Sequence, residues 1–192
     1  MRIFIALLSL PLFLSGCSTI ATGGAEITGL SLLHERRTSN AILNDEGIEI
    51  NASIKLNSEE DTRKLCHFNV TAYNGTVLVT GETPTEKLRN KIITIVRTIP
   101  DVKLVHNELT IAQPSSFSSR SNDTFITTKV KSSLSNIQNL PGFDATRVKV
   151  ITENGSVYLL GLVHKNEAHV ATEITRRESG VKRVVKIFEY IN

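Results

Sequence analysis

Hydrophobic and polar residues follow the same order twice along the chain, and each copy predicts the same five elements. In each copy two strand-like runs meet at an Asn-Gly step, at residues 74–75 and again at 154–155. Asn-Gly between two such runs is a strong hairpin signal, because a type I′ turn requires positive φ at both central residues. A further strand follows each hairpin. The strands expected from this pattern lie at residues 68–73, 76–81, 102–111, 148–153, 156–161 and 181–191.

Apolar residues spaced three or four apart predict a helix before and after each hairpin. Before each hairpin, an aspartate and three apolar residues recur with the same spacing, so Asp45 and Asp123 are expected as helix N-caps. Residues 48–56 also alternate apolar and polar, which alone favours a strand, but the match between the copies favours a helix. The apolar positions of the four helices are Ile48, Ala52, Leu56; Leu88, Ile92, Ile95, Ile99; Ile126, Val130, Leu134; and Ala168, Ala171, Ile174.

These elements predict an α+β fold with two tandem αββαβ domains. In each domain two helices can cover one face of a three-stranded mixed sheet. The Ser-rich segment 113–122, which contains Pro114, is expected to be a linker. This places the first domain at residues 38–112 and the second at 123–192. Domains of about 70 residues have small cores, so the two copies are expected to support one another by packing.

The N-terminus predicts an export signal followed by a lipid anchor. The apolar run 3–14 is shorter than the roughly 20 residues that span a bilayer, and it has the size of a signal-peptide core. A Leu-Ser-Gly-Cys sequence ending at Cys17 then resembles the bacterial lipobox, in which the signal is removed before a cysteine that becomes lipidated. We therefore expect a signal peptide over 1–16, a lipidated Cys17, and a flexible tether over 17–37. Ser18 after the cysteine implies, by the same resemblance, transfer to the outer membrane, with the protein facing the periplasm.

Composition and charge narrow the function further. With 40% hydrophobic and 21% charged residues, the 192-residue chain is typical of a globular protein. The net charge of +3 is divided unevenly: residues 38–112 carry 8 basic and 10 acidic side chains, and residues 113–192 carry 11 and 7. Basic residues near an anionic surface each contribute about 1 kcal/mol, so the second domain is the better candidate for binding anionic lipid. A soluble basic domain without such a partner also fits this charge.

The repeated unit resembles the BON domain, since it combines the αββαβ order with a glycine that closes the second strand at Gly81 and Gly161. Two such units behind a lipobox resemble the dual BON-domain outer-membrane lipoproteins. This resemblance implies a non-enzymatic envelope protein that binds anionic phospholipid through its second BON domain, supports outer-membrane integrity and acts at the division site. The stretches that carry it are Asn69–Tyr73, Ser121–Thr124, Ile126–Val130, Glu153–Gly155, Gly161–Val163 and Ser179–Val184.

The first helix of the second domain supplies the candidate lipid-binding residues. At about 100° per residue, its core stripe leaves Phe125, Thr128 and Ser132 in the outward sector, with Lys129 and Lys131 on either side. An exposed aromatic ring flanked by lysines suits insertion between headgroups, with phosphate contacts alongside. In the family resembled here this helix contacts lipid, and a Trp commonly stands at the position of Phe125. The alternative is that Phe125 packs against the first domain or the linker.

Nothing in the sequence indicates catalysis. There is no Gly-rich phosphate loop and no nucleophile motif, so we expect no catalytic residue, cofactor or small-molecule substrate. The five histidines lack a metal-ligand spacing and are expected to be structural, so no metal site is predicted. Cys66 is the only thiol left once Cys17 is lipidated, and it is expected to be buried and inert. A periplasmic location excludes genomic nucleic acid as a partner.

One alternative to lipid binding stays open. The chain could be an interaction adaptor for outer-membrane assembly, division or peptidoglycan-remodelling proteins, with the anchor as its only membrane contact. Lipid affinity of the domains without Cys17 would distinguish the two functions.

Overall fold

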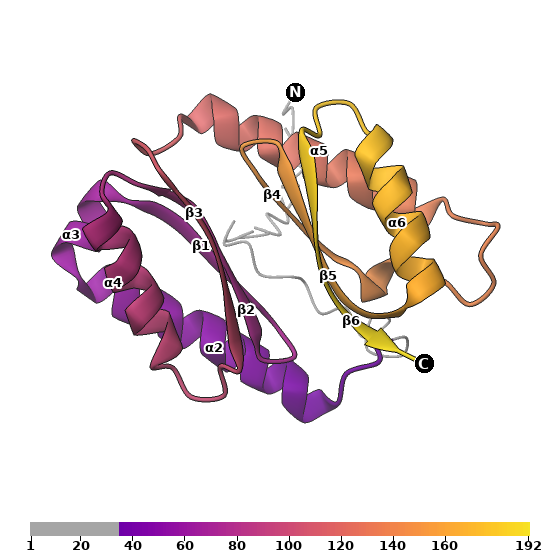
Figure 1. Ribbon diagram of the computed structural model, residues 1–192, viewed down its shortest axis with the longest axis horizontal. Coiled ribbons are helices and arrows are strands. Elements are labelled where there is room, and N and C mark those ends of the chain that lie inside the picture. Colours follow the sequence, from indigo (N-terminus) through magenta and orange to yellow (C-terminus); the bar gives the residue numbers. More distant parts are fainter. Residues whose placement is uncertain (1–34) are drawn as a thin grey trace, which may run out of the picture.

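The computed structural model describes residues 35–192, so the expected signal peptide, Cys17 and residues 18–34 of the expected tether lie outside the described residues. Figure 1 shows two sheets in the middle of the molecule, with helices on both outer sides. The first domain contains α2 (Ser39–Ser58), α3 (Glu60–Leu65), β1 (His67–Tyr73), β2 (Thr76–Thr83), α4 (Glu86–Arg97) and β3 (Leu104–Ile111). The second domain contains α5 (Phe117–Ser135), the 3₁₀ turn η1 (Ala145–Arg147), β4 (Lys149–Glu153), β5 (Ser156–His164), α6 (Lys165–Arg177) and β6 (Arg183–Ile191).

Both predicted hairpins and both mixed sheets are confirmed. The strand orders are β1-β2-β3 and β4-β5-β6, with an antiparallel hairpin and a parallel third strand in each sheet. Asn74 and Asn154 have φ values of 52° and 51°, and the glycines that follow them have 80° and 75°. These are the positive angles that a type I′ turn demands, which is why the Asn-Gly steps located both hairpins.

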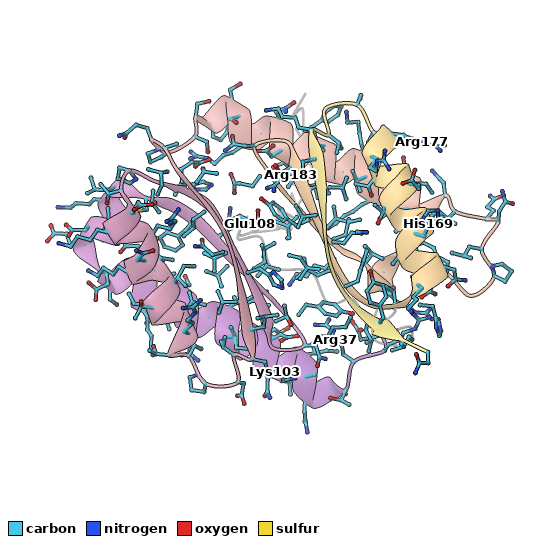
Figure 2. All side chains as sticks on the ribbon, viewed as in Figure 1. Arg37, Lys103, Glu108, His169, Arg177 and Arg183 are labelled. Atoms are coloured by element: carbon cyan, nitrogen blue, oxygen red, sulfur yellow. The ribbon has the colours of Figure 1, made fainter. Side chains whose placement is uncertain are left out.

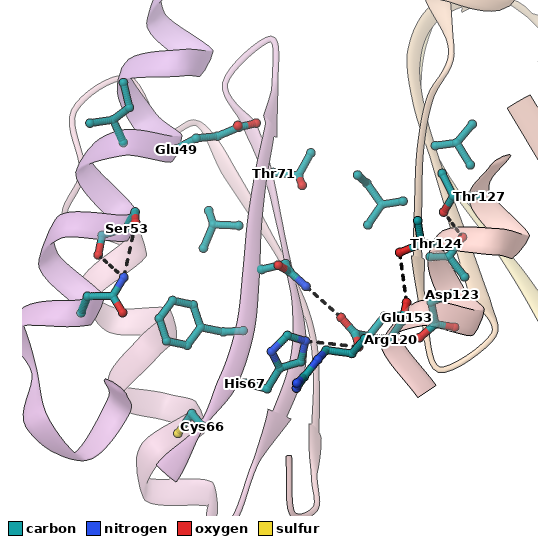
Figure 3. Close-up of a pocket in the computed structure, with 18 of the residues that line it drawn as sticks. Glu49, Ser53, Cys66, His67, Thr71, Arg120, Asp123, Thr124, Thr127 and Glu153 are labelled. Carbon is teal, nitrogen blue, oxygen red and sulfur yellow. Dashed lines mark hydrogen bonds and ion pairs between the residues drawn. The ribbon is translucent and has the colours of Figure 1, made fainter. Parts of the chain in front are cut away.

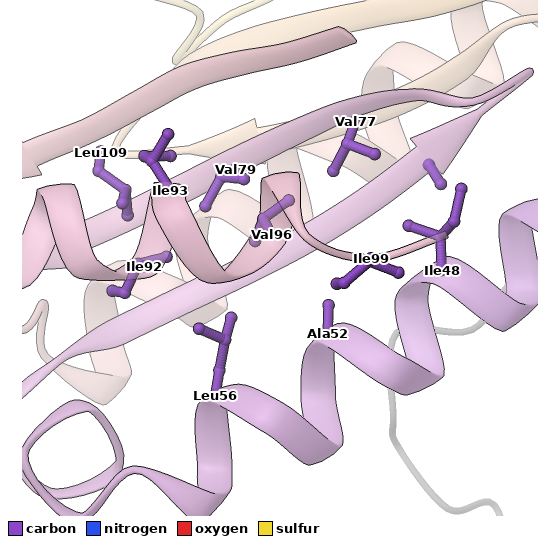
Figure 4. Close-up of a cluster of buried hydrophobic side chains, with 11 residues drawn as sticks. Ile48, Ala52, Leu56, Val77, Val79, Ile92, Ile93, Val96, Ile99 and Leu109 are labelled. Atoms are coloured by element: carbon purple, nitrogen blue, oxygen red, sulfur yellow. The ribbon is translucent and has the colours of Figure 1, made fainter. Parts of the chain in front are cut away.

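Each domain has its own apolar core between its sheet and its two long helices. Figure 4 shows this core in the first domain, where Ile48, Ala52 and Leu56 of α2 meet α4 and the sheet. Residues 48–56 are therefore helical, as the repeat predicted. Ile50 and Ile54 lie on the exposed side of α2, which explains the alternating pattern that locally favoured a strand. The equivalent second core contains Ile126, Val130, Leu134, Val148, Val150, Val157, Leu159, Val163, Ala168 and Ala171.

The N-cap of the first helix lies seven residues earlier than predicted in each domain. Thr38 caps α2, and Ser116 caps α5 by accepting a hydrogen bond from the Ser119 N–H. The prediction of Asp45 and Asp123 as N-caps was therefore wrong, and residues 117–122 of the expected linker are helical. A serine hydroxyl serves as an N-cap as well as an aspartate does, so the Ser-rich composition concealed the start of α5.

Asp45 and Asp123 instead hold the hairpin turns. Each carboxylate is buried within its helix and accepts hydrogen bonds of 2.7–2.9 Å from the two backbone N–H groups of an Asn-Gly turn. Asp45 serves the turn at 74–75 and Asp123 the turn at 154–155. The two aspartates therefore occupy equivalent positions because each binds a hairpin turn, and not because each begins a helix.

The two sheets pack face to face and bury a third apolar cluster between the domains. Figure 2 shows Glu108 and Arg183 facing each other in this interface, where the guanidinium donates to the carboxylate at 2.9 Å. A second link joins the turn of the first domain to β6, since Asn74 Nδ2 donates to Glu189 at 2.6 Å. The two domains therefore pack against each other, as expected, and they do so through the faces of their sheets that the helices leave uncovered. The apolar members are Tyr73, Leu78, Tyr158, Leu160 and Ile187.

The last residues of the expected tether bind both domains. Arg36 forms an ion pair of 2.5 Å with Glu167 of the second domain, whereas Arg37 forms one of 2.7 Å with Asp45 of the first. The Arg37 guanidinium also lies 3.9 Å from the ring centroid of Tyr73. The assignment of residues 35–37 to a flexible tether was therefore wrong, because these two arginines supply countercharge to buried carboxylates.

Candidate functional site

The outward face of α5 carries a continuous exposed stripe, which we call the α5 stripe. It contains Phe117, Ser121, Phe125, Thr128 and Ser132, whose spacing of four, four, three and four residues keeps them on one side of the helix. All five are exposed, and the two phenylalanines have 78% and 61% of their surface accessible. The predicted exposure of Phe125, Thr128 and Ser132 is confirmed, and their contact with lipid stays a prediction.

Phe117 is the member of this stripe that the sequence interpretation missed. The sequence pattern predicts a helix that begins at Asp123, which places Phe117 in the expected linker. The available signal was Ser116, an N-cap residue directly before an apolar residue that lies eight positions from Phe125. Two exposed aromatic rings on one helix side give this face an apolar character that interaction sites for membranes and proteins share.

The two candidate lysines lie on different sides of the helix. Lys129 extends over Phe125, with Nζ 4.8 Å from the ring centroid, and donates hydrogen bonds to the carbonyl and the hydroxyl of Ser179. These oxygens are neutral, so they do not compensate the positive charge beside the exposed ring. Lys131 is exposed on the opposite side, where it lines a groove. Within residues 35–192 neither lysine forms an ion pair with a carboxylate.

This groove runs between the two domains and has a volume of about 1240 Å³ (Figure 3). One wall is α2, where Ile50 and Ile54 are exposed, and the other is α5, where Thr124 and Lys131 line it. The edge strands β1 and β4 contribute most of its remaining lining, together with Arg63 of α3 and Cys66. The α2 wall therefore combines two exposed isoleucines with polar residues, whereas the α5 wall is polar and includes the basic Arg120 and Lys131.

A buried polar cluster lies at one end of the groove. Glu153 receives a hydrogen bond of 3.1 Å from Asn69 Nδ2, and its Oε1 lies 3.7 Å from His67 Nε2. Figure 3 shows His67 and Glu153 pointing toward one another. Burial, together with the nearby charge of Glu82, raises the pKa of Glu153 to about 7. Burial also lowers the pKa of His67, although the Glu82 charge opposes this shift, so the imidazole is neutral at pH 7.

The Cys66 thiol is half-buried and free. Burial, and next the charge of Asp61, raise the pKa of this thiol, which reduces its thiolate fraction at neutral pH. Its environment is therefore that of an unreactive cysteine.

Along residues 35–192, no helix has both the length and the apolar character needed to cross a membrane.

The sequence matches the BON domain family over residues 45–113 and again over residues 122–192. It is 33% identical over 187 residues to the outer membrane lipoprotein DolP of Haemophilus influenzae, covering 97% of this chain and 94% of that relative. It is also 32% identical over 155 residues to the 21 kDa hemolysin of Actinobacillus pleuropneumoniae, covering 81% and 78%. A solved C-terminal domain of CdsD, a structural protein of the type III secretion system of Chlamydia trachomatis, has a TM-score of 0.30 and 14% identity, covering 77% of this chain and 67% of that one.

Proposed function

The chain belongs to the BON-domain family, and we propose that it is an outer-membrane lipoprotein whose second BON domain binds anionic phospholipid. In this role it supports outer-membrane integrity and acts at the division site, without enzymatic activity. Its similarity to an outer membrane lipoprotein over nearly the whole chain supports the location. The observation that carries the lipid-binding proposal is the α5 stripe, with two exposed phenylalanines and an uncompensated lysine.

The spacing of the two rings suits contact with a flat surface. At 1.5 Å per residue, Phe117 and Phe125 lie about 12 Å apart along the helix axis, so both can enter the headgroup region when α5 lies on the membrane. Ser121 between the rings, and Thr128 and Ser132 beyond them, are small, so they leave room for headgroups. Burying one phenylalanine side chain is worth about 1.5–3 kcal/mol, or roughly a tenfold to 150-fold change in affinity.

The lysines give the surface its preference for anionic lipid. Lys129 lies beside the Phe125 ring, so a phosphate next to the inserted ring is within its reach, and Ser179 holds the side chain in place. Lys131 lies on the groove side and adds charge near the surface without bordering the ring. Each is expected to contribute about 1 kcal/mol on an anionic membrane, an effect that decreases with salt.

Flotation with vesicles tests this proposal on a lipid-free form that begins at Ser18. The wild-type form should float with phosphatidylglycerol vesicles but not with phosphatidylcholine vesicles. Phe125→Glu should lose at least tenfold in apparent affinity, and Lys129→Glu should lose about fivefold. Matched controls are Leu43→Glu, an equally exposed apolar residue in the first domain, and Lys165→Glu, an exposed lysine on α6. If Phe125→Glu floats like wild type, the assignment of the stripe is wrong.

The anchor is tested separately from the stripe. Labelling with radioactive palmitate should modify the wild-type chain and fail with Cys17→Ser. An anchored chain carrying Phe125→Glu should stay in the outer membrane yet lose its enrichment at the division site. Loss of membrane association by that variant would instead mean that the anchor does not hold the protein by itself.

The groove favours a second candidate function, that of a protein-interaction adaptor. The two exposed isoleucines and the two edge strands beside them suit an extended segment of a partner, which could pair with a strand edge and place apolar side chains against Ile50 and Ile54. If the lipid-free form shows no vesicle affinity while Ile50→Glu abolishes function in the cell, the adaptor function replaces lipid binding.

A further inference from the structure

Three side chains from both domains converge in the polar cluster between the sheets. His67 of β1 and Glu82 of β2 are cross-strand neighbours in the first sheet, and Glu153 is the last residue of β4 in the second. One potential ligand atom from each, an imidazole nitrogen or a carboxylate oxygen, lies within 4.8 Å of the other two. Both carboxylates are buried, with 2% exposure for Glu82 and 6% for Glu153.

Within the described residues, the negative charge of this cluster has no lysine or arginine as an ion-pair partner. Two other buried carboxylates of the described chain have arginines: Asp45 pairs with Arg37 at 2.7 Å, and Glu167 with Arg36 at 2.5 Å, whereas buried Asp123 accepts two backbone N–H groups. Within residues 35–192 no lysine or arginine forms an ion pair with Glu82 or Glu153. Since burying a charge is costly without a countercharge, this cluster favours a cation.

Neutral donors satisfy only part of the cluster. Glu82 accepts hydrogen bonds from the Asn154 side-chain amide and from the Ser115 backbone N–H, the latter at 3.1 Å. The Arg120 guanidinium donates to the Ser115 carbonyl at 2.9 Å, and its charge acts on His67, but it forms no ion pair with either glutamate.

A buried hydroxyl without a partner also points into the cluster. Thr80 is 99% buried, and its Oγ1 lacks a hydrogen-bond partner within the described residues. Thr80 precedes Glu82 by two positions in β2 and pairs with Asn69 in β1, so its side chain shares their face of the sheet. It lies close enough to Glu153 to lower the pKa of that carboxyl, but not in good hydrogen-bond geometry. A water molecule on a bound metal would give this hydroxyl the partner it lacks.

We propose that His67, Glu82 and Glu153 bind one divalent transition-metal ion, with Zn²⁺ as the best fit, and that this ion joins the two BON domains. One imidazole nitrogen and two carboxylate oxygens match the zinc sites that have three protein ligands and an open position for water. Mg²⁺ and Ca²⁺ prefer oxygen ligands alone, so the histidine disfavours them. Zinc bonds of about 2.0–2.2 Å place ligand atoms about 3.4 Å apart, so ligand atoms that lie within 4.8 Å of one another need to close by up to about 1.4 Å.

Metal titration of the full chain in detergent micelles tests this site. After dialysis against a chelator, calorimetry with ZnCl₂ should show one ion per chain, and CoCl₂ should give the visible bands of four-coordinate cobalt without a thiolate band. His67→Gln and Glu153→Gln should each reduce zinc affinity at least tenfold, because each removes one of three ligands. The exposed controls His169→Gln and Glu46→Gln should stay within twofold of wild type.

The melting temperature provides a second readout that does not depend on affinity. Zinc should raise it for the wild type but not for Glu153→Gln, which without metal should be at least as stable as the wild type because a buried charge is removed. No stoichiometric zinc binding, equal affinity in the wild type and both site variants, or a cobalt–thiolate band would each overturn the proposal. The first outcome would mean that a shared proton, not a metal, compensates the two carboxylates. Vesicle flotation of Glu153→Gln should match wild type, since the α5 stripe does not include this site.

Discussion

Replacing either buried aspartate of the repeat by asparagine should destabilise the protein, and the change should cost more at Asp45 than at Asp123. Both carboxylates accept two hydrogen bonds from the backbone of an Asn-Gly turn. An amide of the same shape can accept through its oxygen but places its NH₂ group where the carboxylate accepted. One turn N–H is then left buried without a partner.

The magnitudes follow from the partners of each side chain. Asp123→Asn loses one charge-assisted hydrogen bond but also removes a buried charge, which offsets part of that loss. We therefore expect its free energy of unfolding to fall by about 2 kcal/mol. Asp45→Asn also removes the ion pair with Arg37, whose guanidinium then retains Glu35 alone. Breaking a buried pair from one side costs about 3–5 kcal/mol, so we expect about 4 kcal/mol for Asp45→Asn.

Urea unfolding followed by far-ultraviolet circular dichroism measures this difference on the form beginning at Ser18. The control is Asp101→Asn, which is exposed and has a φ of 66° that asparagine tolerates, so its effect should stay within about 0.5 kcal/mol. Equal losses at positions 45 and 123 would show that the Arg37 pair contributes nothing. A loss below about 0.5 kcal/mol for Asp123→Asn would refute the assigned role of the helix–turn hydrogen bonds.

Three further predictions test the packing, the turns and the link from residues 35–37. Leu160→Ala should cost about 2–5 kcal/mol in urea unfolding, although it lies outside both domain cores, because it opens a cavity between the sheets. Gly155→Ala should lower the melting temperature more than Gly142→Ala: both have positive φ, but only at 155 does a new Cβ meet a backbone carbonyl, at 3.1 Å. Burial alone would raise the pKa of Glu167, yet hydrogen bonds, first from Arg36, lower it below 4.5. The stabilisation is therefore present above pH 4.5 and is lost as pH falls through the lowered value, so the stability deficit of Glu167→Gln at pH 7 should shrink at low pH.

Local signals in the sequence located the elements that depend on local geometry. Both hairpins followed from Asn-Gly, because few other dipeptides adopt two consecutive positive φ angles. The first helices followed from the recurring spacing, but their starts did not. The preference of aspartate for N-caps and its affinity for turn N–H groups are the same chemistry, so only the three-dimensional position of Asp45 and Asp123 separates the two roles.

The interface and the polar cluster depend on tertiary structure. Residues 157–163 form a nearly continuous apolar run, the signal of a strand covered on both faces, and this could have indicated that a second layer lies over the sheet. No spacing could have revealed the cluster of His67, Glu82 and Glu153, because its members come from three strands and two domains. Phe117 was missed for a simpler reason, namely that a serine-rich helix start has the composition of a linker.

The face-to-face packing of the sheets has a consequence for genetic experiments. A gene truncated to one copy would leave Tyr158, Leu160 and Ile187, or Tyr73 and Leu78, in water. Such single domains would tend to associate with each other or to be degraded. A deletion phenotype would therefore combine the loss of function with the effects of a newly exposed apolar surface. Single substitutions on the outer helices avoid this ambiguity, because they leave the internal pseudo-dimer intact.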